Sequence, residues 1–223
     1  MTAAAGDERP EGAATGPDGS AAGGRAASGP GAAKRSLRRD LLDARARLSP
    51  DDVRQAAEAI ARQALSLPEL TGARTLAAYV SVGREPGTRA LLDALRARGV
   101  RVLLPVLMAD DDLDWGAYEG AEQLVRAGRG LLEPAGPRLG PDAVREADAV
   151  LLPGLAVDAR GMRLGRGGGS YDRVLARLAD SATTAVPPLV VLLYANEVVA
   201  HLPEEAHDHP VHAVVTPDGV RRF

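Results

Sequence analysis

A strand, a helix and a second strand follow one another closely between residues 75 and 107. Thr75–Val82 (TLAAYVSV) and Arg101–Leu107 (RVLLPVL) are short apolar runs, typical of buried strands. Thr88–Arg98 between them has helical periodicity, and Gly99 follows at a position where helices commonly end. Because such a unit forms a crossover between parallel strands, the sequence predicts an α/β fold with a mainly parallel sheet.

Further helices and strands are predicted on both sides of this unit. Ser49 precedes Pro50 and two acidic residues, which is typical of a helix N-terminus. Leu113–Gln123 alternates weakly and predicts an edge strand or hairpin, and Leu131–Leu139, broken by proline and glycine, is predicted to be extended. The remaining predictions are helices at Lys34–Leu48, from Pro50 to about Leu65 and at Ser170–Ala179, and buried strands at Asp148–Pro153, Leu189–Tyr194 and Val211–Thr216.

The first 33 residues differ from the rest of the chain. They are mostly Ala, Gly, Pro, Ser and Thr, and they contain no Leu, Ile, Val or aromatic residue. Such a segment buries too little apolar surface to offset its ordering entropy, so we predict a disordered tail. It lacks the apolar region of a secretory signal, and its acidic residues are unlike a transit peptide. Residues 34–223 are then predicted to form a single domain.

The composition excludes several classes of function. A formal net charge of −3 gives no bulk attraction to nucleic acids. The absence of cysteine excludes disulfides, thiolate catalysis and cysteine-ligated metals. The longest apolar runs, such as LVVLLYA from Leu189, are too short to cross a bilayer. We therefore expect a cytoplasmic protein that binds neither nucleic acid nor membrane.

A glycine-rich segment, GMRLGRGGGSYD at residues 161–172, connects a predicted buried strand to a predicted helix. Its glycines let the backbone approach a ligand without Cβ atoms in the way. Successive N–H groups in such a turn bind anions, and the positive end of the following helix adds to this. The segment therefore predicts a phosphate site, built on Gly165, Gly167, Gly168 and Gly169.

Charged residues accompany these glycines. Arg163 and Arg166 supply planar donors that match phosphate oxygens. Asp172 lies in the first turn of the predicted helix, where an acid complements the helix dipole and where a carboxylate also suits Mg²⁺. No Gly-Lys-Ser/Thr ending marks a P-loop, and Ser170 occupies the third glycine position of a dinucleotide fingerprint. A nucleotide site outside these two motifs is predicted, with a flexible surface loop as the alternative.

Four segments resemble the 5-formyltetrahydrofolate cyclo-ligase family, whose members are also called 5,10-methenyltetrahydrofolate synthetases. The most specific is LPGLAVDARGMRLGRGGGSYDRVL at residues 152–175. KRSLR at residues 34–38, YVSVGREPGT at 79–88 and HDHPVHAVVT at 207–216 agree with the family in order and spacing. Three positions depart from the family's pattern: Ser170 replaces a frequent Tyr, His212 a common Asp, and Gly168 a residue that is basic in some members.

The resemblance implies a nucleotide site. Lys34 and Arg38 of the basic first helix would contact ATP, and the glycine-rich segment would hold its phosphates. Asp208 would bind Mg²⁺, with Asp172 as the second carboxylate. The implied ATP contacts are Lys34, Arg38, Arg163, Gly165, Arg166, Gly167, Gly168, Gly169, Ser170 and Tyr171.

The resemblance also implies a folate site next to the nucleotide. Glu85 would accept paired hydrogen bonds from the aminopyrimidine ring of the pterin, with Val80 as an apolar neighbour. Arg166 would contact the folate as well as ATP, and Arg166 and Tyr171 would act in the catalytic step. A solvent-exposed turn residue is the alternative for Glu85.

The reaction implied by the resemblance is the conversion of 5-formyltetrahydrofolate and MgATP to 5,10-methenyltetrahydrofolate, ADP and phosphate. An amide-like formyl oxygen is a poor leaving group, so it must become a phosphate ester before the ring closes. Mg²⁺ would be the cofactor, ATP the co-substrate and the monomer the active form. The implied fold is a three-layer α/β/α sandwich of the type shared with sugar-phosphate isomerases and CoA transferases.

Other hypotheses stay open at this point. A phosphosugar isomerase on the same fold would need neither ATP nor Mg²⁺, and a non-catalytic relative would bind ligands without forming product. His207, His209 and His212 invite a zinc hypothesis, although their spacing matches no common structural site. Trp115 is either a packing residue or a stacking platform, and Tyr194 is a candidate for the border of the same crevice.

Overall fold

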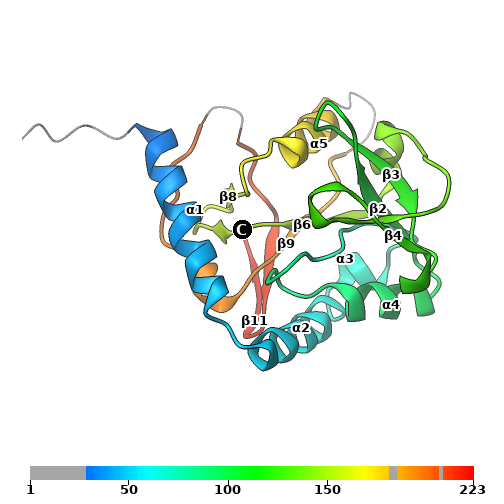
Figure 1. Cartoon of the computed structure of the whole chain (residues 1–223), viewed down its shortest axis with the longest axis horizontal. Coiled ribbons are helices and arrows are strands. Elements are labelled where there is room, and N and C mark those ends of the chain that lie inside the picture. The colour runs from blue at the N-terminus through cyan, green and yellow to red at the C-terminus, as the bar shows by residue number, and fades with distance from the viewer. Residues whose placement is uncertain (1–28, 181–184, 206–207) are drawn as a thin grey trace, which may run out of the picture.

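A central sheet organises the residues that the computed structural model describes, which are 29–180, 185–205 and 208–223. Within these ranges five adjacent strands are parallel, and one antiparallel strand closes each edge. The predicted α/β fold with a mainly parallel sheet is confirmed (Figure 1). In sheet order the strands are β11 (Gly219–Arg222), β10 (Ala213–Thr216), β9 (Leu189–Leu192), β6 (Ala149–Pro153), β1 (Thr75–Ala77), β2 (Arg101–Leu107) and β3 (Leu113–Ala117).

Helices cover both faces of this sheet. In Figure 1, α2, α3 and α4 lie below the sheet and α5 lies above it, where the 3₁₀ helix η3 also packs. None of the helices in the described ranges is long and apolar enough to span a membrane. The α-helices are α1 (Pro30–Ala46), α2 (Pro50–Ala64), α3 (Pro68–Thr71), α4 (Arg89–Ala97) and α5 (Ser170–Ala179), and the 3₁₀ helices are η1 (Ala121–Gln123), η2 (Gly128–Gly130), η3 (Pro141–Glu146) and η4 (Ala195–Glu197).

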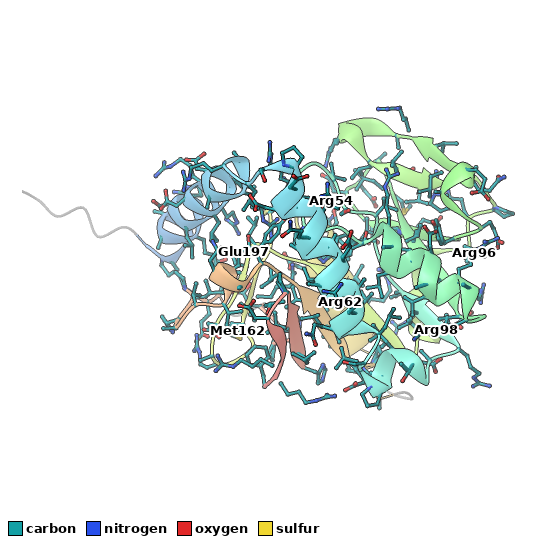
Figure 2. The ribbon with its side chains drawn as sticks, turned by 90° about the horizontal axis from the view of Figure 1, so that it is seen from below. Arg54, Arg62, Arg96, Arg98, Met162 and Glu197 are labelled. Carbon is teal, nitrogen blue, oxygen red and sulfur yellow. The ribbon has the colours of Figure 1, made fainter. Side chains whose placement is uncertain are left out.

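Two hydrophobic cores separate these three layers. Successive strand residues point to opposite faces, so Leu76 packs into one core and Ala77 into the other. Figure 2 looks onto the first face, where α2 and α4 lie side by side over the sheet. Ile60 of α2 is fully buried there, whereas Arg54 and Arg62 on its outer side are exposed. The layered sandwich is therefore confirmed.

The connections of the parallel strands leave in opposite directions at the centre of the sheet. From β1 the chain crosses through α4 to β2 on one side, and from β6 it passes through α5 to β9 on the other. A reversal of this kind leaves a crevice between the carboxyl ends of the two central strands, where ligands bind in open α/β sheets. The fold therefore places a candidate site at the ends of β1 and β6.

Local signals start and stop several helices as predicted. Ser49 Oγ accepts a hydrogen bond from the Asp52 amide (3.1 Å), and the Asp52 carboxylate accepts one from the Ser49 amide (2.9 Å). This reciprocal capping box begins α2. Gly99, just after α4, has a φ of 79°, the left-handed conformation that glycine adopts without a steric penalty.

The first helix packs beside the sheet, not over one of its faces. Leu41 of α1 joins a small core with Leu155, Ala156 and Leu164, on or beside the short hairpin of β7 (Ala156–Val157) and β8 (Arg163–Leu164) (Figure 1). α1 begins at Pro30, so the last residues of the predicted tail, 30–33, are helical. Residues 1–28 of that tail lie outside the described ranges.

Several predicted boundaries were wrong. The strand predicted at Thr75–Val82 ends at Ala77, because the chain then leaves the sheet and Ser81 and Thr88 close a loop through two hydrogen bonds. The β7–β8 hairpin and the edge strand β11 were not predicted, since their pairing is short and β11 is polar. β3 is an edge strand as predicted, and the stretch predicted to be extended contains β5 (Leu132–Pro134), which pairs with β4 (Leu124–Arg126).

Candidate functional site

A cavity of about 400 Å³ lies at the carboxyl ends of β1, β2 and β6, beneath the glycine-rich loop. We call it the switch-point pocket, because it occupies the reversal of the sheet. Its walls come from segments distant in sequence, namely the turn after β1, the ends of β2 and β6, the start of β3, the stretch from Arg129 to Leu132, and the chain from Arg163 into α5. The predicted site residues that line it are Val80, Glu85, Arg163, Gly165, Arg166, Gly167, Gly168, Gly169, Ser170, Tyr171 and Asp172.

The glycine-rich loop turns tightly into the N-terminus of α5. Gly167 (φ 94°) and Gly169 (φ 77°) have positive φ values that other residues rarely adopt. A Cβ on Gly167 would lie 3.3 Å from Cζ of Arg38, so the loop backbone also packs closely against α1. Gly169 is the N-cap of α5, and the first amides of that helix therefore point toward the loop. This geometry suits an anion.

Arg163 is fixed within the wall of the pocket. Its Nη2 pairs with Asp172 Oδ1 (2.9 Å), and its Nη1 donates to the Pro153 carbonyl (3.1 Å). Its Nε has no hydrogen-bond partner among the described residues. Burial lowers the pKa of Arg163, and the negative charges of Asp172 and Asp208 partly offset this by raising it. The guanidinium nevertheless remains protonated at neutral pH. The side chain therefore presents a fixed positive charge beside the loop.

Glu85 is aimed into the pocket by its own turn. Its Oε2 accepts a hydrogen bond from the Val82 amide (2.8 Å), and the residue is only 8% exposed. Arg166, which is half-exposed, places its Nη1 3.5 Å from Glu85 Oε1. The alternative of a solvent-exposed turn residue is therefore wrong. The structure brings the predicted folate carboxylate and the predicted phosphate arginine into one cavity.

Two tyrosines lie deep in the same pocket. Tyr171, at the start of α5, and Tyr79, after β1, are both at the wall, and neither hydroxyl has a hydrogen-bond partner among the described residues. Burial, together with the charge of Glu85, raises the pKa of both phenols well above the usual value of 10. Both hydroxyls therefore stay protonated at neutral pH and are potential hydrogen-bond donors. Tyr79 was not among the predicted site residues.

Lys34, Arg38 and Asp208 lie beside the pocket and do not line it. Lys34 Nζ contacts Asp208 Oδ2 (2.6 Å) and Glu205 Oε2 (2.8 Å). Although burial alone would lower the pKa of Lys34, its hydrogen bonds with Asp208 and Glu205 raise it. Arg38 Nε donates to the Gly165 carbonyl (2.9 Å). The N-terminal half of α1 is thus attached to the glycine-rich loop and to the segment that contains Asp208.

The histidines do not form a zinc site among the described residues, which contain no group of three or more metal-ligating side chains. His212 Nδ1 accepts a hydrogen bond from the Leu189 amide (2.9 Å) at the start of β9, at the amino ends of the parallel strands, whereas the pocket lies at their carboxyl ends. Its role is therefore structural. His207 lies outside the described residues.

The two remaining aromatic candidates are separate from the pocket. Trp115 is fully buried in the core beneath α5, so its interpretation as a packing residue is confirmed. Tyr194 does not line the switch-point pocket, and the prediction that it borders the crevice was wrong. Its hydroxyl donates instead to the Arg84 carbonyl (3.1 Å), behind the turn that carries Glu85.

Other lining residues were missed by the sequence analysis. They lie at or after the carboxyl ends of buried strands, at the start of β3, and in η2 and the segment that follows it, and most are apolar. The residues at the ends of the predicted strands could have been identified from the sequence, because the carboxyl ends of parallel strands meet at one crevice. The principal members are Tyr79, Pro105, Leu107, Leu113, Arg129, Leu131, Pro153 and Gly154.

A model of the 5-formyltetrahydrofolate cyclo-ligase family matches residues 30–217. The chain belongs to this family. The match includes the glycine-rich loop, Glu85, Lys34 and Asp208, and it begins at the first residue of α1.

Relatives and solved structures agree with this assignment to the cyclo-ligases. The 5-formyltetrahydrofolate cyclo-ligase of Mycolicibacterium smegmatis is 42% identical, over 82% of this chain and 93% of its own. The Escherichia coli enzyme is 32% identical, over 78% and 94%. The NMR structure of Aquifex aeolicus 5,10-methenyltetrahydrofolate synthetase superimposes with a TM-score of 0.71 at 29% identity, covering 85% of this chain and 92% of that one. The predicted enzyme class, a cyclo-ligase, is confirmed.

The close packing of Gly167 against Arg38 makes a testable prediction for this cyclo-ligase. Gly167→Ala combines a left-handed backbone with a crowded Cβ, which costs about 1–2 kcal/mol in the loop. We expect the free energy of unfolding, measured by chemical denaturation, to fall by the same amount.

Gly136→Ala is the matched control, because a Cβ there meets no atom within 4 Å and its φ is not positive. Gly136 is also outside the pocket lining. Equal losses in both variants would contradict the prediction.

Proposed function

We propose that this chain closes 5-formyltetrahydrofolate to 5,10-methenyltetrahydrofolate with ATP, through a phosphorylated formyl oxygen. One observation carries the proposal above all. Glu85, suited to a pterin, and the loop from Arg163 to Asp172, suited to a triphosphate, share a single cavity. Arg166 spans the two, with its guanidinium 3.5 Å from Glu85. A phosphoryl group and a folate bound there would be neighbours.

The nucleotide occupies the glycine-rich side of the pocket in this proposal. Amides of the loop and of the first turn of α5 would bind phosphate oxygens. Arg163 and Arg166 would neutralise their charge, and Lys34 and Arg38 would add positive charge from α1. The hydrogen bond from Arg38 to the Gly165 carbonyl supports this role, since it attaches α1 to the loop.

The folate occupies the side formed by β1 and β2. The Glu85 carboxylate would accept N–H donors from the aminopyrimidine ring, and Val80 would pack against the pterin. Leu107, Leu113 and Leu131 give this end of the pocket an apolar wall. Such a combination of a few polar groups and an apolar lining is typical of small-molecule sites.

The chemistry requires positioning and charge neutralisation. The formyl oxygen attacks the γ-phosphorus of ATP and ADP leaves. N10 of the folate then attacks the formyl carbon and loses its proton, so that a C–N bond replaces an N–H bond, and the phosphate departs with the former formyl oxygen. Such phosphoryl transfer needs in-line placement and cations more than a protein nucleophile. Arg166 would balance the charge that develops, and the protonated Tyr171 hydroxyl would donate a hydrogen bond to either ligand.

Mg²⁺ is the cofactor in this proposal, and the donor set fits it. Asp172 lines the pocket with its side chain 43% exposed, and Asp208 lies close enough to affect the pKa of Arg163. Carboxylate oxygens, together with substrate phosphates, are the ligands that Mg²⁺ prefers. Asp172 and Asp208 would hold the ion, which would supply additional neutralisation of the triphosphate.

A spectroscopic assay for the methenyl product tests the proposed reaction. The purified protein is incubated with 5-formyltetrahydrofolate in the presence and absence of ATP and of Mg²⁺. Product and ADP should appear together only in the complete mixture. An isomerase would release no ADP in response to the folate, and a non-catalytic relative would bind both ligands without forming product. Either result would exclude the proposal.

Glu85→Gln should separate the two halves of the site. The substitution removes a charged hydrogen-bond acceptor, which is worth about 1.5–3 kcal/mol. We expect the KM for 5-formyltetrahydrofolate to rise about 10- to 100-fold and the KM for ATP to change little.

Glu119→Gln is a control at an exposed position away from the pocket. If Glu85→Gln raised the KM for ATP and not that for the folate, the assignment of the two halves would be reversed.

Asp172→Asn tests the proposed metal ligand. We expect the Mg²⁺ concentration for half-maximal activity to rise about 10- to 100-fold, with activity recovering at high Mg²⁺. Asp180→Asn at the C-cap of the same helix is the control. Because Asp172 also pairs with Arg163, a loss of activity that Mg²⁺ does not relieve would mean that Asp172 only supports the arginine.

We also propose that the residues from α1 onward are the complete catalytic domain, acting as a monomer. Residues 1–28 contain no Leu, Ile, Val or aromatic residue, so their composition offers little apolar surface for packing. Deletion of these residues should leave the kcat and both KM values unchanged. The shortened protein should still elute from a size-exclusion column as a monomer of its own, smaller mass. A large rise in either KM would assign the segment a role in binding.

A further inference from the structure

A buried ion pair lies behind the switch-point pocket. Arg45, at the end of α1, is 4% exposed, and Glu197 of η4 is 1% exposed. The pair is bidentate, with Nε to Oε1 at 2.7 Å and Nη2 to Oε2 at 2.9 Å. Neither residue lines the pocket, and the proposed reaction gives neither a role.

The pair holds two segments that shape the pocket. Arg45 Nη2 also donates to the Gly154 carbonyl (2.7 Å), and Gly154 is part of the pocket wall. Glu197 Oε2 accepts from the Tyr194 amide (2.9 Å), and the Tyr194 ring lies 5.6 Å from Cζ of Arg45. This network fixes the end of β6 and the end of β9 relative to α1.

The network extends to the turn that carries Glu85. The Tyr194 hydroxyl donates to the carbonyl of Arg84, the residue immediately before Glu85 (3.1 Å). In the same turn the Glu85 amide donates to the Val82 carbonyl (3.2 Å), and the Val82 amide donates to the Glu85 carboxylate (2.8 Å). The position of the Glu85 carboxylate therefore depends on a backbone that Tyr194 holds from behind.

The pKa of Arg45 also reflects its proximity to Glu85. Burial opposes the charge on Arg45, but the hydrogen bonds and charge of Glu197 raise its pKa, and Glu85 and Tyr79 contribute in the same direction. Arg45 is therefore within electrostatic reach of the pocket carboxylate. Buried ion pairs add little stability compared with apolar residues of similar size, because desolvation offsets their attraction. Loss of one partner alone, by contrast, would leave a buried charge unpaired.

α1 carries the other end of the connection. Lys34, Arg38, Leu41 and Arg45 are spaced by four, three and four residues, so they lie on one face of the helix. Lys34, Leu41 and Arg45 are buried, and Arg38 contacts the glycine-rich loop. One helix face thus contacts the loop at its start and the network behind Glu85 at its end.

We propose that Arg45 is a positioning residue. Together with Glu197 and Tyr194 it holds the turn that carries Glu85 in a fixed position relative to the glycine-rich loop, which α1 contacts at its other end. The proposal deepens the function given above, since it rests on Glu85 binding the folate and on the loop binding ATP. A purely structural role is the alternative. It predicts that stability and folate binding change together.

Tyr194→Phe tests the link to the Glu85 turn with the smallest change. It removes one hydroxyl and leaves the Arg45–Glu197 pair intact. We expect the KM for 5-formyltetrahydrofolate to rise about three- to tenfold, with the KM for ATP unchanged.

Tyr118→Phe is the matched control, because it removes another tyrosine hydroxyl bond, to Asp93, from a residue that does not line the pocket. It should change neither KM. Unchanged folate KM in Tyr194→Phe would overturn the proposal.

The double variant Arg45→Met with Glu197→Leu separates positioning from stability. Arg45→Met alone leaves Glu197 buried without its cation, and we expect a lower melting temperature. The double variant removes both charges and should recover most of that loss. If the pair positions Glu85, the folate KM of the double variant stays raised at least threefold while its melting temperature returns toward that of the natural protein.

A double variant with the natural folate KM would overturn the proposal and leave the pair a structural feature. The reference in every series is the natural protein. If that protein itself formed no methenyl product with MgATP, the proposed function would fail. If it were active and the variants matched it, only the positioning role would fail.

Discussion

The reversal of the sheet between β1 and β6 is the constraint on which the rest of the site depends. The crossovers from these two adjacent parallel strands leave in opposite directions, so no crossover covers their carboxyl ends. The chain after β1 is free to form the turn with Glu85, and the chain after β6 turns out through Gly154 toward the glycine-rich loop. A pocket at this position follows from topology, and the side chains only determine what it binds.

Pairs of opposite charges lie in the wall of this pocket, beside it and behind it. Taking a cation out of water is costly unless a carboxylate accompanies it, and each buried cation here has one. A phosphate entering the pocket would share Arg163 and Arg166, which line it, with the carboxylates that already hold them. Its affinity would then be the difference between the attraction of phosphate to these cations and the attraction of the carboxylates that it competes with. The pairs are Lys34–Asp208, Arg163–Asp172, Arg166–Glu85 and Arg45–Glu197.

Features with a local cause could be predicted from the sequence. The glycine-rich loop, the helix at Ser170–Ala179 and the cap at Ser49 depend on neighbouring residues, and the structure has them where the sequence places them. The end of β1 could not be predicted, since an apolar run does not reveal where a strand leaves its sheet. Tyr79 was missed for this reason. It was included in a strand, whereas it lies in the loop that forms the pocket wall.

The Arg45–Glu197 pair could not be predicted because its members are 152 residues apart. Each alone looks like an ordinary charged surface residue, and only the fold makes them neighbours. The spacing of Lys34, Arg38 and Arg45 on one helix face was a partial signal, since a cation at a core-facing position needs a partner. The consequence is mechanical. An α-helix rises about 1.5 Å per residue, so Lys34 and Arg45 are separated by about 16 Å along α1. A rigid helix with one end on the Asp208 segment and the other on Glu197 and the Gly154 carbonyl fixes the spacing of these two parts of the structure around the pocket.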